Sequence, residues 1–183
     1  MPASDDKNET FATVERQLGA RRDLDNPPLH RWHPALSGDI DIVIRADGSW
    51  WHEGEPIVRP EIVRLFSKLL RREDDGHYYL VTPGEKWRLR VEAYPLLVTG
   101  MERNAEGVFI ATLNTGKEVA LDSTHPLFLD SQHAGVAGVG LDHGLRALCT
   151  RAAWYRLVEE AEEESGIPVV RSGDCCWPLL PAP

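Results

Sequence analysis

Short segments in which apolar and polar residues alternate, each ending at a tight-turn signal, are the feature that most constrains the fold. The clearest are DIDIVIR, residues 39–45, and the run 85–122, in which EKWRLRVE, LLVTGME, GVFIATL and EVALD follow one another across the turns RNAE and NTGK. A period of two places successive side chains on opposite faces of a strand. Consecutive strands of hairpin length predict an antiparallel meander or a small curved sheet.

The turn after the first of these strands is followed by two adjacent tryptophans, Trp50 and Trp51. Neighbouring strand residues point to opposite faces, so both rings cannot enter one core. A two-residue loop, Asp47-Gly48, would place Trp51 on the isoleucine face, whereas a three-residue loop with Gly48 left-handed would place Trp50 there. We favour the three-residue loop because Ala46-Asp47 suits a type I turn. This loop predicts that Trp50 is in the core and Trp51 faces the other way.

Two segments have the 3.6-residue periodicity of amphipathic helices. The first, RPEIVRLFSKLLRRE at residues 59–73, carries an apolar stripe of Ile62, Leu65, Phe66, Leu69 and Leu70. The second, RAAWYRLVEEAEEES at residues 151–165, follows Thr150 as its cap and carries a stripe of Trp154, Leu157, Val158 and Ala161. The Gly-rich stretch 130–144 reads as a loop, and residues 168–179, PVVRSGDCCWPL, read as a hairpin. Together with the strands, these helices predict an α+β protein.

Net charge, apolar segment length and cysteine count limit which kinds of partner and which cell compartment the chain can have. A net charge of −9 works against counterion-release binding to duplex DNA or RNA, although a few local arginines can hold a small nucleotide. No segment approaches the roughly 18 apolar residues of a membrane span, so no membrane partner is expected. The N-terminus, MPASDDKNET, does not resemble a signal peptide, and three cysteines do not form a secreted disulfide framework. We therefore expect a cytoplasmic protein.

The sequence contains no strong catalytic or metal-binding motif. The residues that come closest to a zinc-ligand set are His125, His133, Asp142 and His143. They lack the short local spacings that zinc sites commonly use, and surface histidines explain them better. Cys175 and Cys176 are adjacent, so in a strand one of them would be a small buried hydrophobe. We expect no metal and no cofactor and assign no catalytic residues; the sequence leaves catalytic activity undecided and favours a binding role over an enzymatic one.

Basic residues offer a binding chemistry instead. They fall on the first predicted helix and on one face of a predicted strand: Arg64, Lys68, Arg71 and Arg72, then Lys86, Arg88 and Arg90. If these two faces meet, they could hold phosphates through charge-assisted hydrogen bonds, with a ring such as Trp51 stacking on a base. The alternative is that the arginines pair with the surplus Asp and Glu of the chain.

Residues 38–86, from GDIDIVIRADGSWWHEGEP to GHYYLVTPGEK, resemble a bacterial family named domain of unknown function 1285, DUF1285. The resemblance continues through VEAYPLLV, THPL, GLRALCTRAAWYRLVEEAEEE and RSGDCCWPL, and LRREDDGHYYLVTPGEK is its most specific block. It implies a core built by domain duplication. After a tail of residues 1–37, residues 38–85 would form a small α+β domain. Residues 86–183 would form a curved antiparallel sheet with a helix, similar to the pleckstrin-homology fold.

The resemblance also implies a function. A nucleotide-like small molecule would bind in the cleft between the two domains, in a signalling role that involves a protein partner and no established catalysis. The matched positions expected to contact this ligand are Arg71, Arg72, Thr82, Glu85, Lys86, Ser172 and Gly173, and Trp51 is the candidate aromatic wall, unless the second domain or the tail covers it. The alternative is a protein-interaction or structural module without a small-molecule site.

Overall fold

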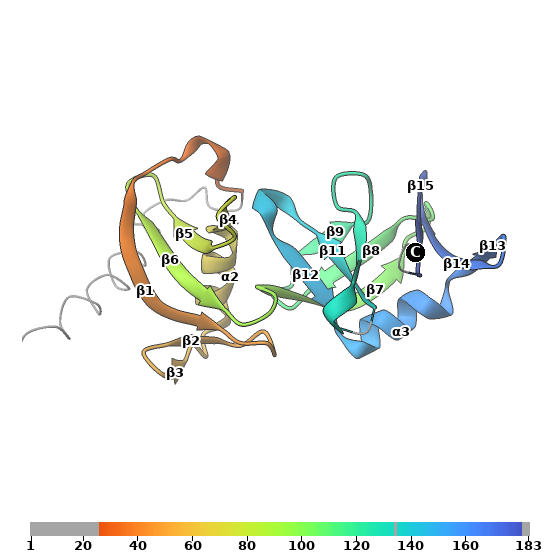
Figure 1. Ribbon diagram of the computed structural model, residues 1–183, viewed down its shortest axis with the longest axis horizontal. Coiled ribbons are helices and arrows are strands. Elements are labelled where there is room, and N and C mark those ends of the chain that lie inside the picture. The colour runs from red at the N-terminus through yellow and green to blue at the C-terminus, as the bar shows by residue number, and fades with distance from the viewer. Residues whose placement is uncertain (1–25, 134, 181–183) are drawn as a thin grey trace, which may run out of the picture. The chain divides into compact units, whose positions relative to one another are not determined.

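The computed structural model describes residues 26–133 and 135–180. The chain divides into two compact units, residues 1–92 and 93–183. The described residues hold two α-helices, two six-stranded sheets and one three-stranded sheet (Figure 1). The protein is therefore mostly sheet with two helices, in keeping with the α+β class predicted from the sequence. In the described part of the chain, no helix is long and apolar enough to cross a membrane.

The first unit is a six-stranded sheet that packs one face against a helix (Figure 1). In chain order its elements are η1 (Leu29–Arg31), β1 (Leu36–Ile44), β2 (Trp50–His52), β3 (Glu55–Pro56), α2 (Pro60–Lys68), β4 (Leu70–Arg72), β5 (Tyr78–Val81) and β6 (Lys86–Val91). The strands lie in the order β3-β2-β1-β6-β5-β4. β1 and β6 run parallel, and all the other neighbours in this sheet run antiparallel.

The turn between β1 and β2 confirms the predicted three-residue loop. The Arg45 amide donates to the Ser49 carbonyl, and the Gly48 amide donates to the Arg45 carbonyl, both at 2.9 Å. Gly48 has φ +81°, the left-handed conformation that a residue without Cβ adopts freely. Trp50 is consequently buried with 2% of its surface exposed, next to the ring of Phe66 at 6.3 Å between centroids.

Helix α2 is shorter than its apolar stripe predicts. It ends at Lys68, so Arg71 and Arg72 lie on β4 and not on the helix. The stripe is misleading because Leu69 and Leu70 are fully buried although they lie beyond the helix, so their apolar character does not distinguish helix from strand. The Val81 amide donates to the Leu69 carbonyl and fixes the strand conformation that follows.

The boundary between the units lies at residue 92, not at residue 85 as expected from the sequence. The reason is β6, which pairs with both β1 and β5 and is therefore central to the first sheet. The expected tail also contributes to this unit. Leu29 of η1 is 1% exposed, so at least residues 29–32 pack onto the domain instead of trailing from it.

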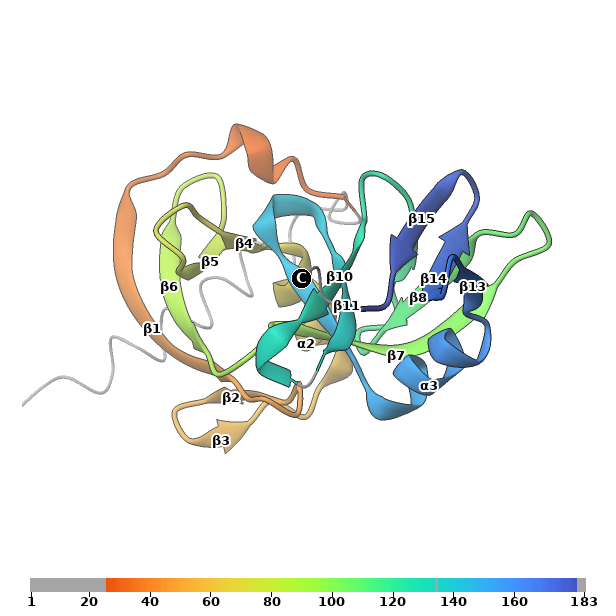
Figure 2. The ribbon, with the colours of Figure 1, turned by 45° about the vertical axis from the view of Figure 1, so that its right-hand side comes forward.

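The second unit combines a six-stranded sheet, a helix and a small three-stranded sheet (Figure 2). Its elements are β7 (Leu96–Arg103), β8 (Phe109–Leu113), β9 (Glu118–Ala120), β10 (Leu127–Asp130), η2 (Ser131–His133), β11 (Val136–Gly140), η3 (Asp142–Gly144), β12 (Arg146–Cys149), α3 (Arg151–Glu159), β13 (Glu162–Glu164), β14 (Ile167–Ser172) and β15 (Cys175–Pro178). Helix α3 lies beside β7 and β12, with Thr150 as its cap, as predicted (Figure 2).

Two sequence predictions fail in this unit. The Gly-rich stretch contains a full strand, β11, which pairs with β10 and β12. A glycine is needed at position 138 because the ring of Phe128 occupies the space that a Cβ would take. The second helix ends at Glu159, and the glutamates that follow it form β13, whose Glu162 and Glu164 pair with Arg171 of β14. The predicted hairpin of β14 and β15 is confirmed.

The two large sheets share one topology. Each consists of two three-stranded meanders, and the first strand of the first meander runs parallel to the last strand of the second: β1 with β6, and β7 with β12. The sequence had predicted a purely antiparallel second sheet. The structure corrects this, because the pair of β7 and β12 is parallel and the sheet is therefore mixed. The helix is placed differently, between the meanders in the first unit and after them in the second.

Candidate functional site

One face of the first sheet carries half of the ligand contacts predicted for the first unit, namely Trp51, Arg71 and Lys86. The other face buries Ile40, Ile42, Ile44, Leu80 and Leu89 in the core. Directly paired strand residues share a face, so the pairing Asp39–Arg88–Tyr79–Arg71 runs across four strands on the opposite side. We call this side the outer face. Alternation along β6 adds Lys86 and Arg90 to it. Val43 and Trp51 belong to it as well, because Val43 is paired with both Arg90 and Trp51.

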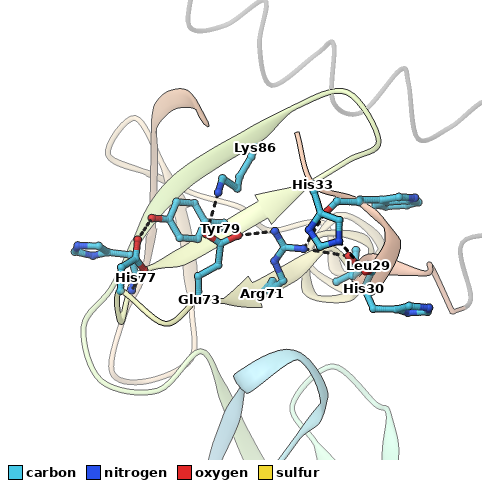
Figure 3. A network of polar contacts seen from close by, with 10 residues as sticks. Leu29, His30, His33, Arg71, Glu73, His77, Tyr79 and Lys86 are labelled. Atoms are coloured by element: carbon cyan, nitrogen blue, oxygen red, sulfur yellow. Dashed lines mark hydrogen bonds and ion pairs between the residues drawn. The ribbon is translucent and has the colours of Figure 1, made fainter. Parts of the chain in front are cut away.

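At one end of the outer face Arg71 is the centre of a polar network (Figure 3). One of its Nη atoms donates to the carbonyls of Leu29 at 3.0 Å and Trp32 at 2.9 Å, and the other binds Glu73. Lys86 Nζ reaches the second oxygen of Glu73 at 2.9 Å. Arg71 and Lys86 therefore meet on a carboxylate of the same chain, and Arg71 also holds the N-terminal segment in place.

The pKa values in this network follow from its geometry. Burial alone would raise the pKa of Glu73, but hydrogen bonds from Lys86 and Arg71 outweigh it and hold that pKa below its usual range. Glu73 therefore stabilises the fold above its ordinary pKa, and this contribution is lost as the pH falls through the lowered folded-state value. The hydrogen bond from Tyr79 to Asp75, followed by burial, raises the pKa of Tyr79 to about 12.

Replacing Arg71 with alanine is expected to lower the free energy of unfolding by about 2 kcal/mol. The change leaves two carbonyls and one oxygen of the Glu73 carboxylate without their donor, in a network whose side chains are only 12% (Arg71) and 25% (Glu73) exposed. Denaturant unfolding measures this loss. As a control, Arg156→Ala removes an exposed ion pair on α3 and should change stability by less than about 0.5 kcal/mol. Equal effects of the two substitutions would contradict a structural role for Arg71.

A groove of about 400 Å³ opens where β1 and β6 part, and its lining includes Asp41, Val43 and Arg90 of the outer face. The parallel pairing is regular at Asp39–Arg88 and again at Val43–Arg90, but residues 40–42 of β1 bulge between these pairs. The groove is lined by residues 39–43, 76–78 and 88–91. It therefore belongs wholly to the first unit and needs no residue from the second.

Some charged residues of this groove are unpaired in the described part of the chain, whereas the cations around Glu73 are paired with its carboxylate. Arg88 is neutralised by Asp39, which accepts from its Nε at 2.6 Å and its Nη2 at 2.9 Å. Within residues 26–133 and 135–180, Arg90 and Asp41 make no ion pair, although both line the groove. His77 is exposed beside them. Arg90 is thus available to an anion from outside, whereas Arg71 and Lys86 are already engaged.

Trp51 borders the groove through its pairing with Val43. Its ring is half-buried, its Nε1 donates to Ser49 Oγ at 2.8 Å, and the guanidinium of Arg45 lies 3.5 Å from the ring centroid. The second tryptophan is therefore neither a core residue nor a bare surface ring. Trp51 supports an exposed, planar guanidinium on the outer face, through a cation–π contact.

The other predicted site residues of the first unit have structural contacts. Thr82 and Glu85 close the β5–β6 turn, since the Glu85 amide donates to Thr82 Oγ1 and the Thr82 amide donates to the Glu85 carbonyl. Arg72 is exposed, and its guanidinium lies 5.9 Å from the centroid of the Tyr78 ring. None of these three lies among the residues that line the groove.

Ser172 and Gly173 belong to the second unit, where they attach the three-stranded sheet to the larger one. Ser172 is 2% exposed; its hydroxyl accepts from the Phe109 amide at 2.8 Å and donates to the Leu121 carbonyl at 2.7 Å. The Gly173 amide donates to the Gly107 carbonyl at 3.2 Å. Both residues therefore make their hydrogen bonds to other residues of the second unit.

The histidines and cysteines are spread over separate places in the described part of the chain. The described ranges, 26–133 and 135–180, contain no group of three or more His, Cys, Asp or Glu side chains placed to hold a metal. His125 lies between Asp122 and Asp142, at 3.5 and 3.6 Å. Cys175 is half-buried and Cys176 is exposed, so the fully buried cysteine is Cys149, where burial raises the pKa of the thiol to about 12.

Sequence reasoning missed four residues that define the groove and its border: Asp39, Asp41, Arg45 and His77. The signal for the first three was the alternation of DIDIVIR, which already placed them opposite the isoleucines. What the sequence did not show was that β6 lies beside β1, because a parallel pair is formed by segments distant in the chain.

Comparisons with known proteins agree along most of the chain. Residues 27–94 match the model of the N-terminal domain of DUF1285, a domain of unknown function, and residues 95–179 match its C-terminal domain. A crystal structure of a DUF1285 family protein from Silicibacter pomeroyi DSS-3 is 33% identical, with a TM-score of 0.80, and covers 91% of this chain and 94% of that one. One from Shewanella baltica OS155 is 27% identical, with a TM-score of 0.55, and covers 66% of this chain and 92% of that one. No curated protein matches.

Proposed function

The chain belongs to the DUF1285 family, and on that premise we propose that it is a ligand-binding protein that takes a nucleotide-like small molecule and acts in signalling. We place the ligand in the groove of the outer face. The observation that carries this proposal is Arg90, a cation without an ion pair in the described chain that lines a groove of about 400 Å³. Arg90 would bind a phosphate through charge-assisted hydrogen bonds.

The neighbours of Arg90 support a ligand that is both anionic and planar. Arg88 lines the same groove but is held by Asp39, so the additional donor to an anion is the imidazole of His77. Two strands away, roughly 10 Å at the usual strand spacing, Arg45 presents its guanidinium plane on Trp51. Bases stack on guanidinium planes as they do on aromatic rings. A phosphate at Arg90 and a base on Arg45 together describe a nucleotide.

The role of Arg71 and Lys86 in this proposal differs from the one inferred from the sequence. Both are satisfied by Glu73, and a phosphate there would have to displace a carboxylate that receives two charged hydrogen bonds. We therefore assign them to the fold, and Arg90 to the ligand. Ligand binding would be reported to a protein partner, in the cytoplasm, where three free thiols are expected to stay reduced.

Two broader expectations remain part of the proposal. The shared meander topology of the two large sheets supports an origin by duplication. In the second unit, the antiparallel meander β7–β8–β9 and the helix α3 are the parts that support a likeness to the pleckstrin-homology fold; the parallel pair of β7 and β12 does not. The ligand proposal depends on neither.

A thermal-shift screen against AMP, GMP, ATP, GTP, NAD and cyclic dinucleotides tests the proposal. A ligand at 100 times its dissociation constant adds about 2.7 kcal/mol, which shifts the melting temperature by several degrees. Arg90→Ala should weaken a hit about tenfold or more, because a charged hydrogen-bond donor is lost, and should leave the melting temperature of the free protein unchanged. Arg156→Ala is the control for a general loss of positive charge. A flat screen with clean melting would favour the protein-interaction module.

A further inference from the structure

We infer that the nucleotide bound on the outer face carries a guanine base, recognised by Asp41; this inference rests on the proposed function. Asp41 lines the groove beside Val43, which is paired with Trp51 on one side and Arg90 on the other. Asp41 therefore lies two residues along β1 from the position that pairs with both Trp51 and Arg90, and it lines the same groove as Arg90.

The carboxylate of Asp41 has no partner in the part of the chain that the structure describes. Its main-chain carbonyl accepts from the Glu53 amide at 3.1 Å, but its side chain makes no hydrogen bond or ion pair. Asp39, two residues earlier on the same face, is paired at 2.6 Å with Arg88. Asp41 and Arg90 line the same groove without such a pair. Both groups therefore remain available to a ligand that has an anionic part and a donor part.

The chemistry of a carboxylate distinguishes the bases. An ionised carboxylate only accepts hydrogen bonds, through two oxygens side by side. Guanine presents two adjacent donors, its N1–H and its 2-amino group, so it can fill both oxygens. Adenine presents an acceptor at N1 next to its amino group, and that lone pair would face the carboxylate. A base with an acceptor on this edge therefore loses a hydrogen bond and adds a repulsion.

Titration calorimetry with GMP, IMP, AMP and XMP tests the inference. GMP should bind roughly tenfold or more tightly than AMP, and IMP, which lacks the 2-amino group, should lie between them. Asp41→Asn replaces an acceptor with a donor, so it should weaken GMP roughly tenfold and improve XMP, whose 2-carbonyl can accept from the new amide. The control is Asp74→Asn, an exposed carboxylate of the β4–β5 turn outside the groove, which should change neither affinity.

The outcomes separate this inference from the function on which it rests. If GMP and AMP bind equally and both depend on Arg90, the ligand proposal stands and guanine recognition is overturned. If Asp41→Asn leaves the ratio of GMP to XMP affinity unchanged, recognition by Asp41 is likewise overturned. If no nucleotide binds the wild-type protein, both proposals fail.

Discussion

Replacing Trp50 with alanine is expected to lower the free energy of unfolding of the first unit by about 4 kcal/mol. The side chain is 2% exposed and packs beside Phe66, which is itself fully buried. Removing a buried indole forfeits its transfer free energy and leaves a cavity that a strand and a helix cannot close. Urea or guanidinium denaturation, followed by the fluorescence of the remaining tryptophans, measures the change in midpoint.

The adjacent tryptophan supplies the matched control for this measurement. Trp51→Ala removes the same number of atoms from a half-buried position on the outer face, where the ring carries Arg45. We expect it to cost about 1 kcal/mol, since much of the ring is hydrated in the folded state. If the two substitutions were equally costly, the division of this pair between core and outer face would be wrong.

Replacing Gly138 with alanine is expected to destabilise the second unit by about 3 kcal/mol. A Cβ at this position would lie 2.6 Å from the Ala147 carbonyl oxygen and 2.7 Å from Cε1 of Phe128. The carbonyl belongs to the neighbouring strand β12, so it cannot move without breaking the pairing of β11 with β12. Overpacking against backbone in a well-packed sheet typically costs 1–3 kcal/mol, and here two neighbours resist at once.

Gly84→Ala is the control for this substitution. Gly84 lies in the β5–β6 turn, where a Cβ would meet nothing within 4 Å and the backbone does not require a glycine. Thermal or denaturant unfolding of the two variants should therefore differ by several degrees or by a clear shift of midpoint. A Gly138→Ala protein as stable as Gly84→Ala would mean that β11 does not pack under Phe128 as described.

Local patterns predicted most of the secondary structure correctly. The alternation around Ile40, Ile42 and Ile44 identified β1 and its buried face, and the Ala46–Gly48 loop was sufficient to decide which tryptophan enters the core. Thr150 was predicted as a helix cap because threonine is favoured just before a helix, and the structure confirms it, since its side chain accepts from the Ala153 amide. These features depend on neighbours in sequence, so the sequence contains their explanation.

The errors occurred where distant pairing outweighs local preference. Residues after Lys68 follow a helical stripe but form β4, because β5 offers them a strand partner. The glutamates of β13 were predicted as helix and the glycines of β11 as loop. Both segments form strands because β14 and β10 offer them strand partners. The boundary at residue 92 was also missed, since it depends on the parallel pair of β1 and β6.

For the candidate site, the sequence showed where basic residues lie but not which of them already have a partner. The basic face of β6 was visible as the alternation of Lys86, Arg88 and Arg90. Which of these arginines and lysines already have a carboxylate partner depends on Glu73 and Asp39, and their distances cannot be read from sequence spacing. Because Arg71 and Lys86 are paired with Glu73, we propose Arg90 in their place as the phosphate contact.

The division of the outer face into a structural end and a binding end is the central claim. The most direct test titrates GMP and AMP by calorimetry into the wild type, Arg71→Ala and Arg90→Ala, and measures the melting temperature of the same samples. We predict that Arg90→Ala loses affinity at an unchanged melting temperature, whereas Arg71→Ala lowers the melting temperature by several degrees and, while folded, retains binding. Undiminished affinity in Arg90→Ala, or no binding of either nucleotide to the wild type, would contradict the claim.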